Sequence, residues 1–468
     1  MVSEAKAAQP GGRNVLDDLD SRIPTNFYWY LAVLACIGGF LFGYDTSNIG
    51  SALGFIPYHL SSFATGYLVA GASLGAAAGA LIAGPLTDHF GRKALLIADA
   101  AIYAVGAILS AITPDAGVLL FARTLIGLAV GADSAIATAY IAEFAPRSRR
   151  GQLSIIQQWM ITVGILVAYL VAVIILKAAP GSAGNADWRL ILGLGAIPAL
   201  IAVALRSNMP ESPRWLMLHE RYADTRKAFG RLGMDVTEDE VRSAADQLYR
   251  EQRQQKGRVQ WTRGVRRALI IVCLFFIFQQ ITGINVPLYY GPHLLGPIFS
   301  GSHASLVATT VAGVEITAIM TAVNVASTYL GFRWIDKFGR RKLAIGGYAG
   351  MIISALVSAL GLAVLAGTPR LVVIMIGLDL FIASFAVGVG GTGWLIQGEV
   401  FPVWQNAISL AGVLACFAGL CALAIVFVWK FLPETKGLPI EDIIRLFDRQ
   451  QEPRHPSVPE LRHIPLKG

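Results

Sequence analysis

Long apolar segments and short polar loops alternate along almost the whole chain. A transmembrane helix needs about 20 mostly apolar residues. Eleven runs of this kind lie at about residues 29–50, 64–86, 94–113, 117–141, 153–177, 189–206, 266–290, 306–330, 343–366, 371–397 and 408–431. No run has the alternating pattern of a strand, so the sequence predicts an all-α membrane protein with eleven spans.

Lysine and arginine gather in the loops between spans 2 and 3, 4 and 5, and 8 and 9, whereas Lys177 and Arg370 are the exceptions in the opposite loops. Positive residues mark the cytoplasmic side of a membrane protein. We therefore expect these loops, the N-terminus and the polar stretch 207–265 to lie in the cytoplasm of a multi-pass protein of the cell (plasma or inner) membrane.

The composition narrows the class of protein. The 468 residues are 55% hydrophobic and 15% charged, and the mean hydropathy is +0.58, whereas an average soluble domain has about 25% charged residues. The net charge of +8 could suggest a nucleic-acid partner, but the stretch 207–265 has mixed charge and no interleaved aromatic residues. We expect no such partner, no cofactor and no metal, and the absence of a nucleophile elbow or P-loop argues against an enzyme.

The two halves of the chain repeat three short motifs in the same order: DHFGRK (88–93) and DKFGRR (336–341), AEFAP (142–146) and GEVFP (398–402), PES (210–212) and PET (433–435). Parallel repeats of this kind are typical of transporters. Glu143 and Glu211 are 68 residues apart, with two spans between them, but Glu399 and Glu434 are only 35 apart. The second half therefore lacks one span, and the chain looks joined at PVWQNAISLAGVL.

These motifs, together with GGFLFGYDT (38–46), PESPRWL (210–216) and QQITGINVPLYY (279–290), resemble the sugar porters of the major facilitator superfamily. The resemblance covers about residues 30–440. It implies the major facilitator fold of two pseudo-symmetric helical bundles, with eleven spans where the family has twelve and with helix 11 missing. The predicted parts are a cytoplasmic segment 1–28, a six-helix bundle 29–206, an intracellular helical linker 207–265, a second bundle 266–440 and a polar tail 441–468.

A sugar offers hydroxyl groups and apolar ring faces, so its site needs amides and an aromatic ring rather than buried charge. Span 7 supplies Gln279, Gln280 and Asn285, and we expect a break in the helix near Gly283, because such breaks lie at binding sites in transporters. The resemblance assigns these residues to the sugar and adds Gln158, Asn324 and Trp394. A lone intramembrane amide also serves as interhelical glue, and the absent helix 11 removes a contact that the family supplies.

Charged residues inside spans are costly and mark functional sites. Asp45 in span 1 and Arg123 in span 4 match the acid and the arginine of proton-coupled sugar porters. Protonation of the acid would free the arginine and shift the balance between outward-open and inward-open states, although a structural ion pair that never titrates fits the same residues. Asp133, Glu315 and Asp379 also lie in apolar runs without an assigned role, and Asp133 is a second candidate proton carrier.

The resemblance also implies a cytoplasmic gate of salt bridges. Its expected members are Asp88, Arg92, Glu143, Arg150, Asp336, Arg340 and Glu399. The simpler interpretation is positive-inside anchoring with tight turns at Gly91 and Gly339. The second half has no basic residue that matches Arg149 or Arg150.

The sequence thus predicts a secondary active transporter that takes up a monosaccharide with protons by alternating access. Its partners are a small sugar, the proton and the lipid bilayer, and we expect a monomer. Two alternatives remain open: a facilitative porter of a sugar, polyol or organic acid, and a non-transporting variant that has lost a helix.

Overall fold

The computed structural model describes residues 15–21, 25–60, 62–144, 150–256, 274, 277–300 and 304–390. These residues fold almost entirely into helices, and they include no strand. Eight helical segments among them are long and apolar enough to cross a membrane. The run 64–86 falls on a ninth long helix, the run 266–290 is described only in part, and the run 408–431 lies outside the described residues.

The first bundle contains five long helices, followed by two shorter ones. The helices are α2 (Asn26–Ala52), α3 (Ser62–Phe90), α4 (Arg92–Ile112), α5 (Ala116–Phe144), α6 (Arg150–Ala178), α7 (Trp188–Gly193) and α8 (Ala196–Arg206). Small residues let these helices approach closely. A Cβ atom at Gly131 of α5 would lie 1.9 Å from the carbonyl oxygen of Ala76 in α3, so glycine is required where α5 crosses α3.

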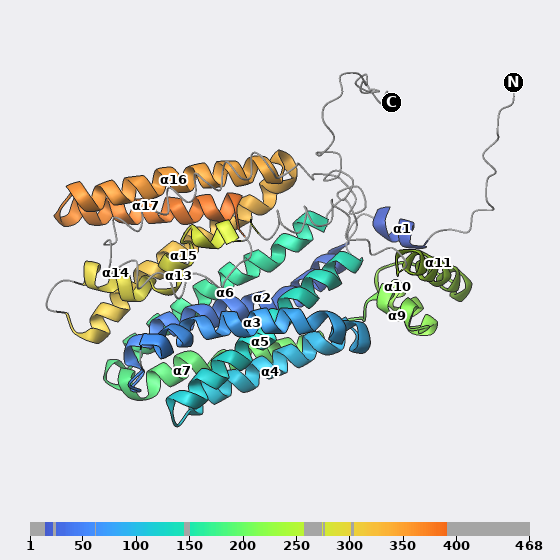
Figure 1. The fold of residues 1–468 in the computed structure, drawn as a ribbon, viewed down its shortest axis with the longest axis horizontal. Coiled ribbons are helices and arrows are strands. Elements are labelled where there is room, and N and C mark those ends of the chain that lie inside the picture. The colour runs from blue at the N-terminus through green and yellow to red at the C-terminus, as the bar shows by residue number, and fades with distance from the viewer. Residues whose placement is uncertain are drawn as a thin grey trace, which may run out of the picture.

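The second bundle contains α13 (Asn285–Tyr289), α14 (Gly291–Phe299), α15 (Leu306–Phe338), α16 (Arg340–Val364) and α17 (Gly367–Gly388). In Figure 1 this yellow-to-orange group lies beside the blue-to-green helices of the first bundle, with the long axes of both groups running in the same direction. Many large apolar side chains point outward from both bundles, including Leu81, Phe121, Ile174 and Val364. An apolar outer surface of this kind is suited to lipid.

The internal repeat has the same local structure in both halves. Helix α3 ends at Phe90, Gly91 takes a φ of +90°, and α4 begins at Arg92. Helix α15 ends at Phe338, Gly339 takes a φ of +85°, and α16 begins at Arg340. Because a positive φ is available to glycine at little cost, the two glycines make the same sharp turn between consecutive spans.

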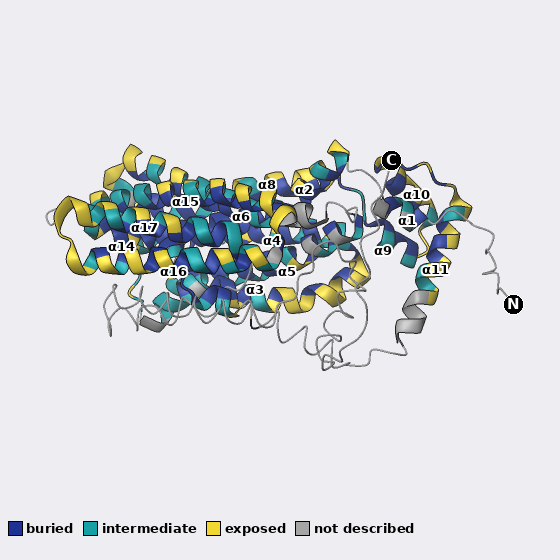
Figure 2. Ribbon diagram, turned by 90° about the horizontal axis from the view of Figure 1, so that it is seen from above, coloured by how far each residue is buried: buried dark blue, intermediate teal, exposed yellow. Residues whose placement is uncertain are grey.

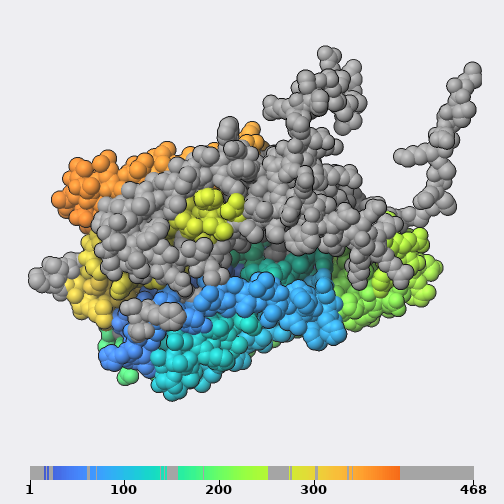
Figure 3. All heavy atoms as spheres, in the orientation of Figure 1, coloured from blue at the N-terminus to red at the C-terminus, as the bar shows by residue number. Residues whose placement is uncertain are grey.

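A small helical unit lies at one end of the bundles and is formed by α9 (Pro213–Leu218), α10 (Tyr222–Arg231) and α11 (Glu238–Lys256), with α1 (Val15–Ser21) packed against α11. The hydroxyl of Ser212 caps α9 by accepting the Trp215 N–H at 3.3 Å. Figure 2 shows that residues of this unit are buried where its helices face one another. In Figure 3 its green atoms extend the molecule past the end of the first bundle.

Candidate functional site

A break in span 7 places the predicted sugar-binding amides. Residues 277–281 are helical, Gly283 takes a φ of +90°, and α13 begins at Asn285. The expected break near Gly283 is therefore confirmed. It puts Gln279 and Gln280 on one side of the break and Asn285 on the other.

The three amides of span 7 form a buried chain of hydrogen bonds. The Nδ2 of Asn285 donates to Oε1 of Gln280 at 2.8 Å, and Nε2 of Gln280 donates to Oε1 of Gln279 at 3.4 Å. The Nε2 of Gln279 donates to the carbonyl oxygen of Val389 at the end of α17. All three amide residues are buried, so the structure brings together the set that the sequence predicted.

Gln158 reaches the same region from the first bundle. A side chain at Gly390 would lie 3.7 Å from Cγ of Gln158, so the segment Val389–Gly390 lies between Gln158 and Gln279. Sequence reasoning missed the neighbouring Gln157, whose amide nitrogen and oxygen are buried with no hydrogen-bond partner among the described residues. An adjacent pair of glutamines inside a span was the available signal.

Asn324 and Trp394 are the other two predicted sugar residues. Asn324 is buried in α15, where the Thr328 hydroxyl donates to its Oδ1 at 3.4 Å. Trp394 lies outside the described residues.

Asp45 and Arg123 form an ion pair in the interior of the first bundle. The Nη1 of Arg123 in α5 donates to Oδ1 of Asp45 in α2, and both side chains are at most 3% exposed. The Nε of Arg123 also donates to the Leu68 carbonyl oxygen in α3 at 3.3 Å. Within the described part of the chain, the Nη2 of Arg123 and the Oδ2 of Asp45 have no partner. The ion pair with Asp45 is therefore the main interaction that holds Arg123 in place.

A second buried ion pair joins Asp133 of α5 to Arg206 at the end of α8. The Nη1 of Arg206 donates to Oδ2 of Asp133 and, at 2.7 Å, to the Leu96 carbonyl oxygen in α4. Its Nε and Nη2 donate to the carbonyl oxygens of Leu34 at 3.2 Å and Ala35 at 2.8 Å, both in α2. Sequence reasoning missed Arg206, although an arginine at the end of an apolar run was a signal.

The remaining two intramembrane acids have different surroundings. Glu315 of α15 pairs with Lys177 at the end of α6, with 43% and 57% of the side chains exposed. This pair links the two bundles, as does the hydrogen bond that the Tyr169 hydroxyl donates to the Leu288 carbonyl oxygen. Asp379 of α17 is half-buried, and its Oδ1 has no partner among the described residues.

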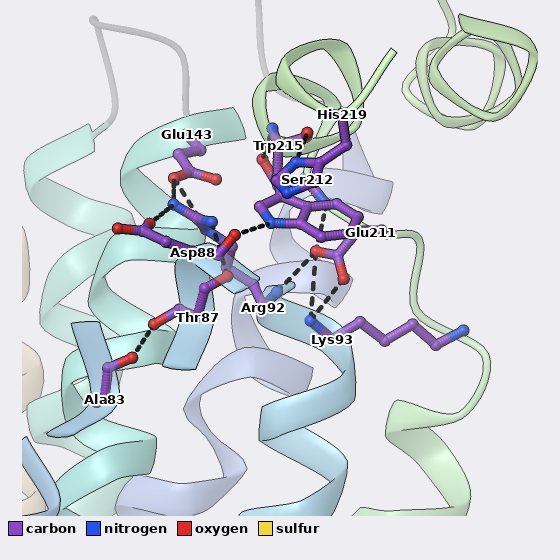
Figure 4. Close-up of polar contacts among 10 residues, drawn as sticks. All are labelled: Ala83, Thr87, Asp88, Arg92, Lys93, Glu143, Glu211, Ser212, Trp215 and His219. Atoms are coloured by element: carbon purple, nitrogen blue, oxygen red, sulfur yellow. Dashed lines mark hydrogen bonds and ion pairs between the residues drawn. The ribbon is translucent and has the colours of Figure 1, made fainter. Parts of the chain in front are cut away.

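The predicted gate of the first half is assembled at the end of the bundle near α9 (Figure 4). The Nη2 and Nε of Arg92 lie 2.9 and 3.1 Å from Oε1 of Glu143, and Nη2 lies 3.5 Å from Oδ1 of Asp88. The structure therefore brings these three residues together. The side chains of Arg150, Asp336 and Arg340, and the whole of Glu399, lie outside the described part of the chain.

Sequence reasoning missed the role of Glu211, which fastens the helical unit to the bundle. Its carboxylate accepts the backbone N–H groups of Arg92 at 3.0 Å and Lys93 at 3.1 Å, at the start of α4. A helix N-terminus favours an anion, because its first N–H groups have no partner in the helix. Burial raises the pKa of Glu211, and the hydrogen bonds from Ser212, Lys93 and Arg92 oppose that rise.

Among the described residues, no group of His, Cys, Asp and Glu has the arrangement of a metal site. The polar interior of the described part of the chain includes the chain of amides in span 7 and two ion pairs within the first bundle. Amides can exchange hydrogen bonds with hydroxyl groups, and a buried carboxylate beside an arginine can take up a proton.

Comparison with known proteins identifies relatives over most of the chain. The model of the family described as "Sugar (and other) transporter" matches residues 31–403 and 398–447. The two matched segments meet where the internal repeat predicts the missing helix. The glucose transporter GlcP of Staphylococcus epidermidis is 32% identical over 450 residues, which are 89% of this chain and 96% of that relative.

Two further comparisons concern coupling and fold. The arabinose-proton symporter of Bacillus subtilis is 30% identical over 93% of this chain and 99% of its own length. The solved structure of the major facilitator superfamily proton:xylose symporter XylE bound to 6-bromo-6-deoxy-D-glucose has a TM-score of 0.75 and 26% identity, and covers 91% of this chain and 100% of that chain. This likeness confirms the predicted major facilitator fold.

Proposed function

The chain belongs to the sugar transporter family, and we propose that it takes up a monosaccharide together with protons by alternating access. The observation that carries the coupling is the buried pair of Asp45 and Arg123. The family is one of membrane transporters, which agrees with the prediction that the chain is a multi-pass membrane protein and not an enzyme. Relatives named as proton symporters of arabinose and xylose support the same assignment.

Proton coupling follows because Arg123 has few interactions other than its ion pair with Asp45. When Asp45 binds a proton it loses its charge, and Arg123 keeps only its bond to the Leu68 carbonyl oxygen. A buried guanidinium that has lost its counter-ion is unstable. The bundle therefore favours a different arrangement of α2, α3 and α5 after protonation, and this difference in free energy shifts the balance between the two open states.

The sugar binds to the chain of amides. Without sugar, Gln280 and Asn285 satisfy each other, and Gln279 bonds the end of α17. A sugar hydroxyl both donates and accepts, so it can replace these bonds without leaving a buried polar group unsatisfied. Gln158 contributes from the first bundle, with Asn324 and Trp394 as further contacts. Because the site has parts in both bundles, sugar binding brings the bundles together.

The gate opens and closes the cytoplasmic side. Asp88, Arg92 and Glu143 hold one another in the first half, and Arg150, Asp336, Arg340 and Glu399 complete the set. The side chains of Arg92 and Glu143 are 14% and 17% exposed, so water weakens their attraction less than at an open surface. Rocking of the bundles breaks these contacts.

Orientation and domain bounds belong to the same proposal. The N-terminal segment 1–28 and the linker 207–265 lie in the cytoplasm. The two bundles are residues 29–206 and 266–440, and the tail is 441–468. Support comes from α1 and α9–α11, which lie at the same end of the bundles as Arg92 and Lys93, because positive residues mark the cytoplasmic side. The protein is a monomer of the cell membrane.

Uptake of labelled hexoses, pentoses and polyols into proteoliposomes, with and without a proton gradient, tests the proposal. We expect gradient-dependent uptake of at least one monosaccharide. Gln280→Ala removes a bond of the amide chain and should raise the KM about tenfold, the cost of one hydrogen bond of about 1.4 kcal/mol. Ser354→Ala is a matched control in α16, because it removes a buried hydroxyl that bonds the Gly350 carbonyl oxygen of its own helix.

A non-transporting variant is the second candidate function, and it is favoured because the family model matches as two separate segments, which overlap at residues 398–403. Its signature is sugar binding without uptake. Ligand-induced quenching of tryptophan fluorescence by a sugar that is not taken up in any gradient would replace the transport proposal with this one.

A further inference from the structure

A cluster of ionisable side chains in the first bundle is not used by the coupling of Asp45. It consists of the ion pair Asp133–Arg206 and a second carboxyl group, Asp99, on α4. Asp99 lies three residues after Leu96, whose carbonyl oxygen binds Arg206. Positions three apart share a helix face, and Asp99 lies within electrostatic reach of both Asp133 and Arg206.

Each carboxyl group of this cluster has an oxygen without a partner. The Oδ1 of Asp133 and the Oδ2 of Asp99 are buried, and neither has a hydrogen-bond partner in the described part of the chain. The two residues are 3% and 6% exposed. A buried carboxylate oxygen without a donor is costly, and a bound proton lowers that cost because it removes the charge.

The charges that face Asp99 come from α5 and α8. Arg206 of α8 supplies one positive charge and Asp133 of α5 supplies one carboxyl group. From α2, the thiol of Cys36 lies near Asp133 and Arg206. One guanidinium can balance one carboxylate, but the cluster has two carboxyl groups. Two like charges in one buried site cannot both be ionised without a large penalty.

We propose that Asp99 and Asp133 share one proton beside Arg206, and so form a second proton-binding site of the first bundle. Arg206 cannot move to balance a second negative charge, because it also donates to the carbonyl oxygens of Leu34, Ala35 and Leu96. The site lies deeper toward the helical unit than Asp45. Asp133 is ten residues after Arg123 in α5, a distance of about 15 Å along the helix axis.

Infrared difference spectroscopy of the purified full-length protein in lipid tests the proposal, because the C=O stretch of a protonated carboxyl group is a direct readout. The background is Asp45→Asn with Asp379→Asn, which removes the bands of two other carboxyl groups inside the spans. At neutral pH we expect a carboxyl band that is lost in both Asp99→Asn and Asp133→Asn. Each single change leaves one carboxyl group for one guanidinium, so the remaining acid ionises.

Asp115→Asn is the matched control, since Asp115 is exposed at the start of α5 and should leave the band unchanged. A band that persists in Asp133→Asn would overturn the sharing of one proton, because an Asp99 protonated by burial alone would not depend on Asp133. A band that is absent before any change at Asp99 or Asp133 would overturn the proposal as well.

A second measurement uses stability and does not depend on sugar transport. Loss of the shared proton at alkaline pH creates an unbalanced buried charge, so the unfolding temperature should fall as the pH rises. Asp99→Asn should remove that fall. Equal alkaline falls with and without Asp99 would contradict the proposal, whereas a failure of gradient-driven uptake would affect only the proposed coupling at Asp45.

Discussion

Two buried ion pairs lie in the first bundle, and they differ in how firmly each arginine is held. Arg206 donates to Asp133 and to three carbonyl oxygens, those of Leu34, Ala35 and Leu96. Arg123 donates to Asp45 and one carbonyl oxygen, and its Nη2 has no partner in the described part of the chain. An aspartate and an arginine form both pairs, but Arg206 is held by several acceptors, whereas Arg123 depends mainly on Asp45.

The difference indicates which pair can act as a switch. Loss of the carboxylate charge leaves Arg206 bonded to two further helices, so α2, α4 and α8 stay together. The same loss at Asp45 leaves Arg123 with a single bond to α3. A ligand shifts a conformational equilibrium only if it stabilises one state more than the other. A proton does this at Asp45, whereas at Asp133 it changes charge without releasing the arginine.

The largest predicted effect comes from Asp45→Asn. A difference of one pH unit supplies about 1.4 kcal/mol per proton, and a membrane potential of 100 mV supplies about 2.3 kcal/mol. One coupled proton therefore supports roughly 500-fold accumulation of sugar. Asp45→Asn should reduce accumulation to equality across the membrane, measured as the internal concentration of labelled sugar in proteoliposomes.

The matched variant for this prediction is Asp115→Asn, which changes an exposed carboxyl group outside both ion pairs and should retain accumulation. Retained accumulation in Asp45→Asn would assign the coupling to another group and remove the distinction between the two pairs.

Replacing each arginine by lysine compares how much the two ion pairs contribute to the free energy of unfolding. Lysine keeps the charge but lacks the planar fork that reaches several acceptors at once. Arg206→Lys should lose about 3 kcal/mol, the worth of one or two charge-assisted bonds, and Arg123→Lys about 1 kcal/mol. Thermal unfolding of the purified variants gives both values. Equal losses would mean that the carbonyl bonds of Arg206 contribute little.

Gly38→Ala tests the geometry of the ion pair between Asp133 and Arg206. A Cβ atom at Gly38 would lie 1.7 Å from Oδ1 of Asp133, so the carboxylate must move away from Arg206. We expect a loss of about 2 kcal/mol in the free energy of unfolding, as for an overpacked core. Gly346→Ala in α16 is the control, because a Cβ there meets nothing within 4 Å. A neutral effect at Gly38 would show that Asp133 is not fixed in this position.

The smallest predicted effect concerns Glu211, a carboxylate held by backbone N–H groups instead of an arginine side chain. Burial raises its pKa in the folded protein, so the folded state binds a proton more tightly than the unfolded state does. The contribution of Glu211 to stability is therefore greatest below its unfolded pKa, and it declines as the pH rises to the folded value.

Hydrogen exchange of α9 and α10 at several pH values measures this dependence. Glu211→Gln should flatten it, and Asp224→Asn is the control, because Arg221 and Lys227 lower the pKa of that exposed carboxyl group. An unchanged slope in Glu211→Gln would place the pH dependence elsewhere.

The sequence predicted most of the fold and half of the polar interior. Hydropathy alone located the eight described segments that are long and apolar enough to cross a membrane, because backbone groups in lipid must be satisfied within helices. The break at Gly283 and the pair of Asp45 and Arg123 followed from residue type and family resemblance. Arg206 was missed because its partners lie in α2, α4 and α5, and no spacing along the chain reveals how those helices are rotated toward one another.

Glu211 was missed for a related reason. From the sequence, a glutamate after a span is expected to be a solvated loop residue. Only the structure shows that Glu211 caps the N-terminus of α4, where it binds the N–H of Lys93, 118 residues earlier in the chain. Repeated motifs were more informative, since the turns at Gly91 and Gly339 have the same geometry in both halves.

The most direct test of the central claim, that the pair of Asp45 and Arg123 couples protons to sugar, is the proton uptake that sugar itself induces. Proteoliposomes without any ion gradient receive sugar from outside, and a pH indicator follows the external solution. The account predicts alkalinisation with the wild-type protein and none with Asp45→Asn, while both exchange labelled sugar. Sugar-induced alkalinisation in Asp45→Asn, or sugar entry without it in the wild-type protein, would contradict the account.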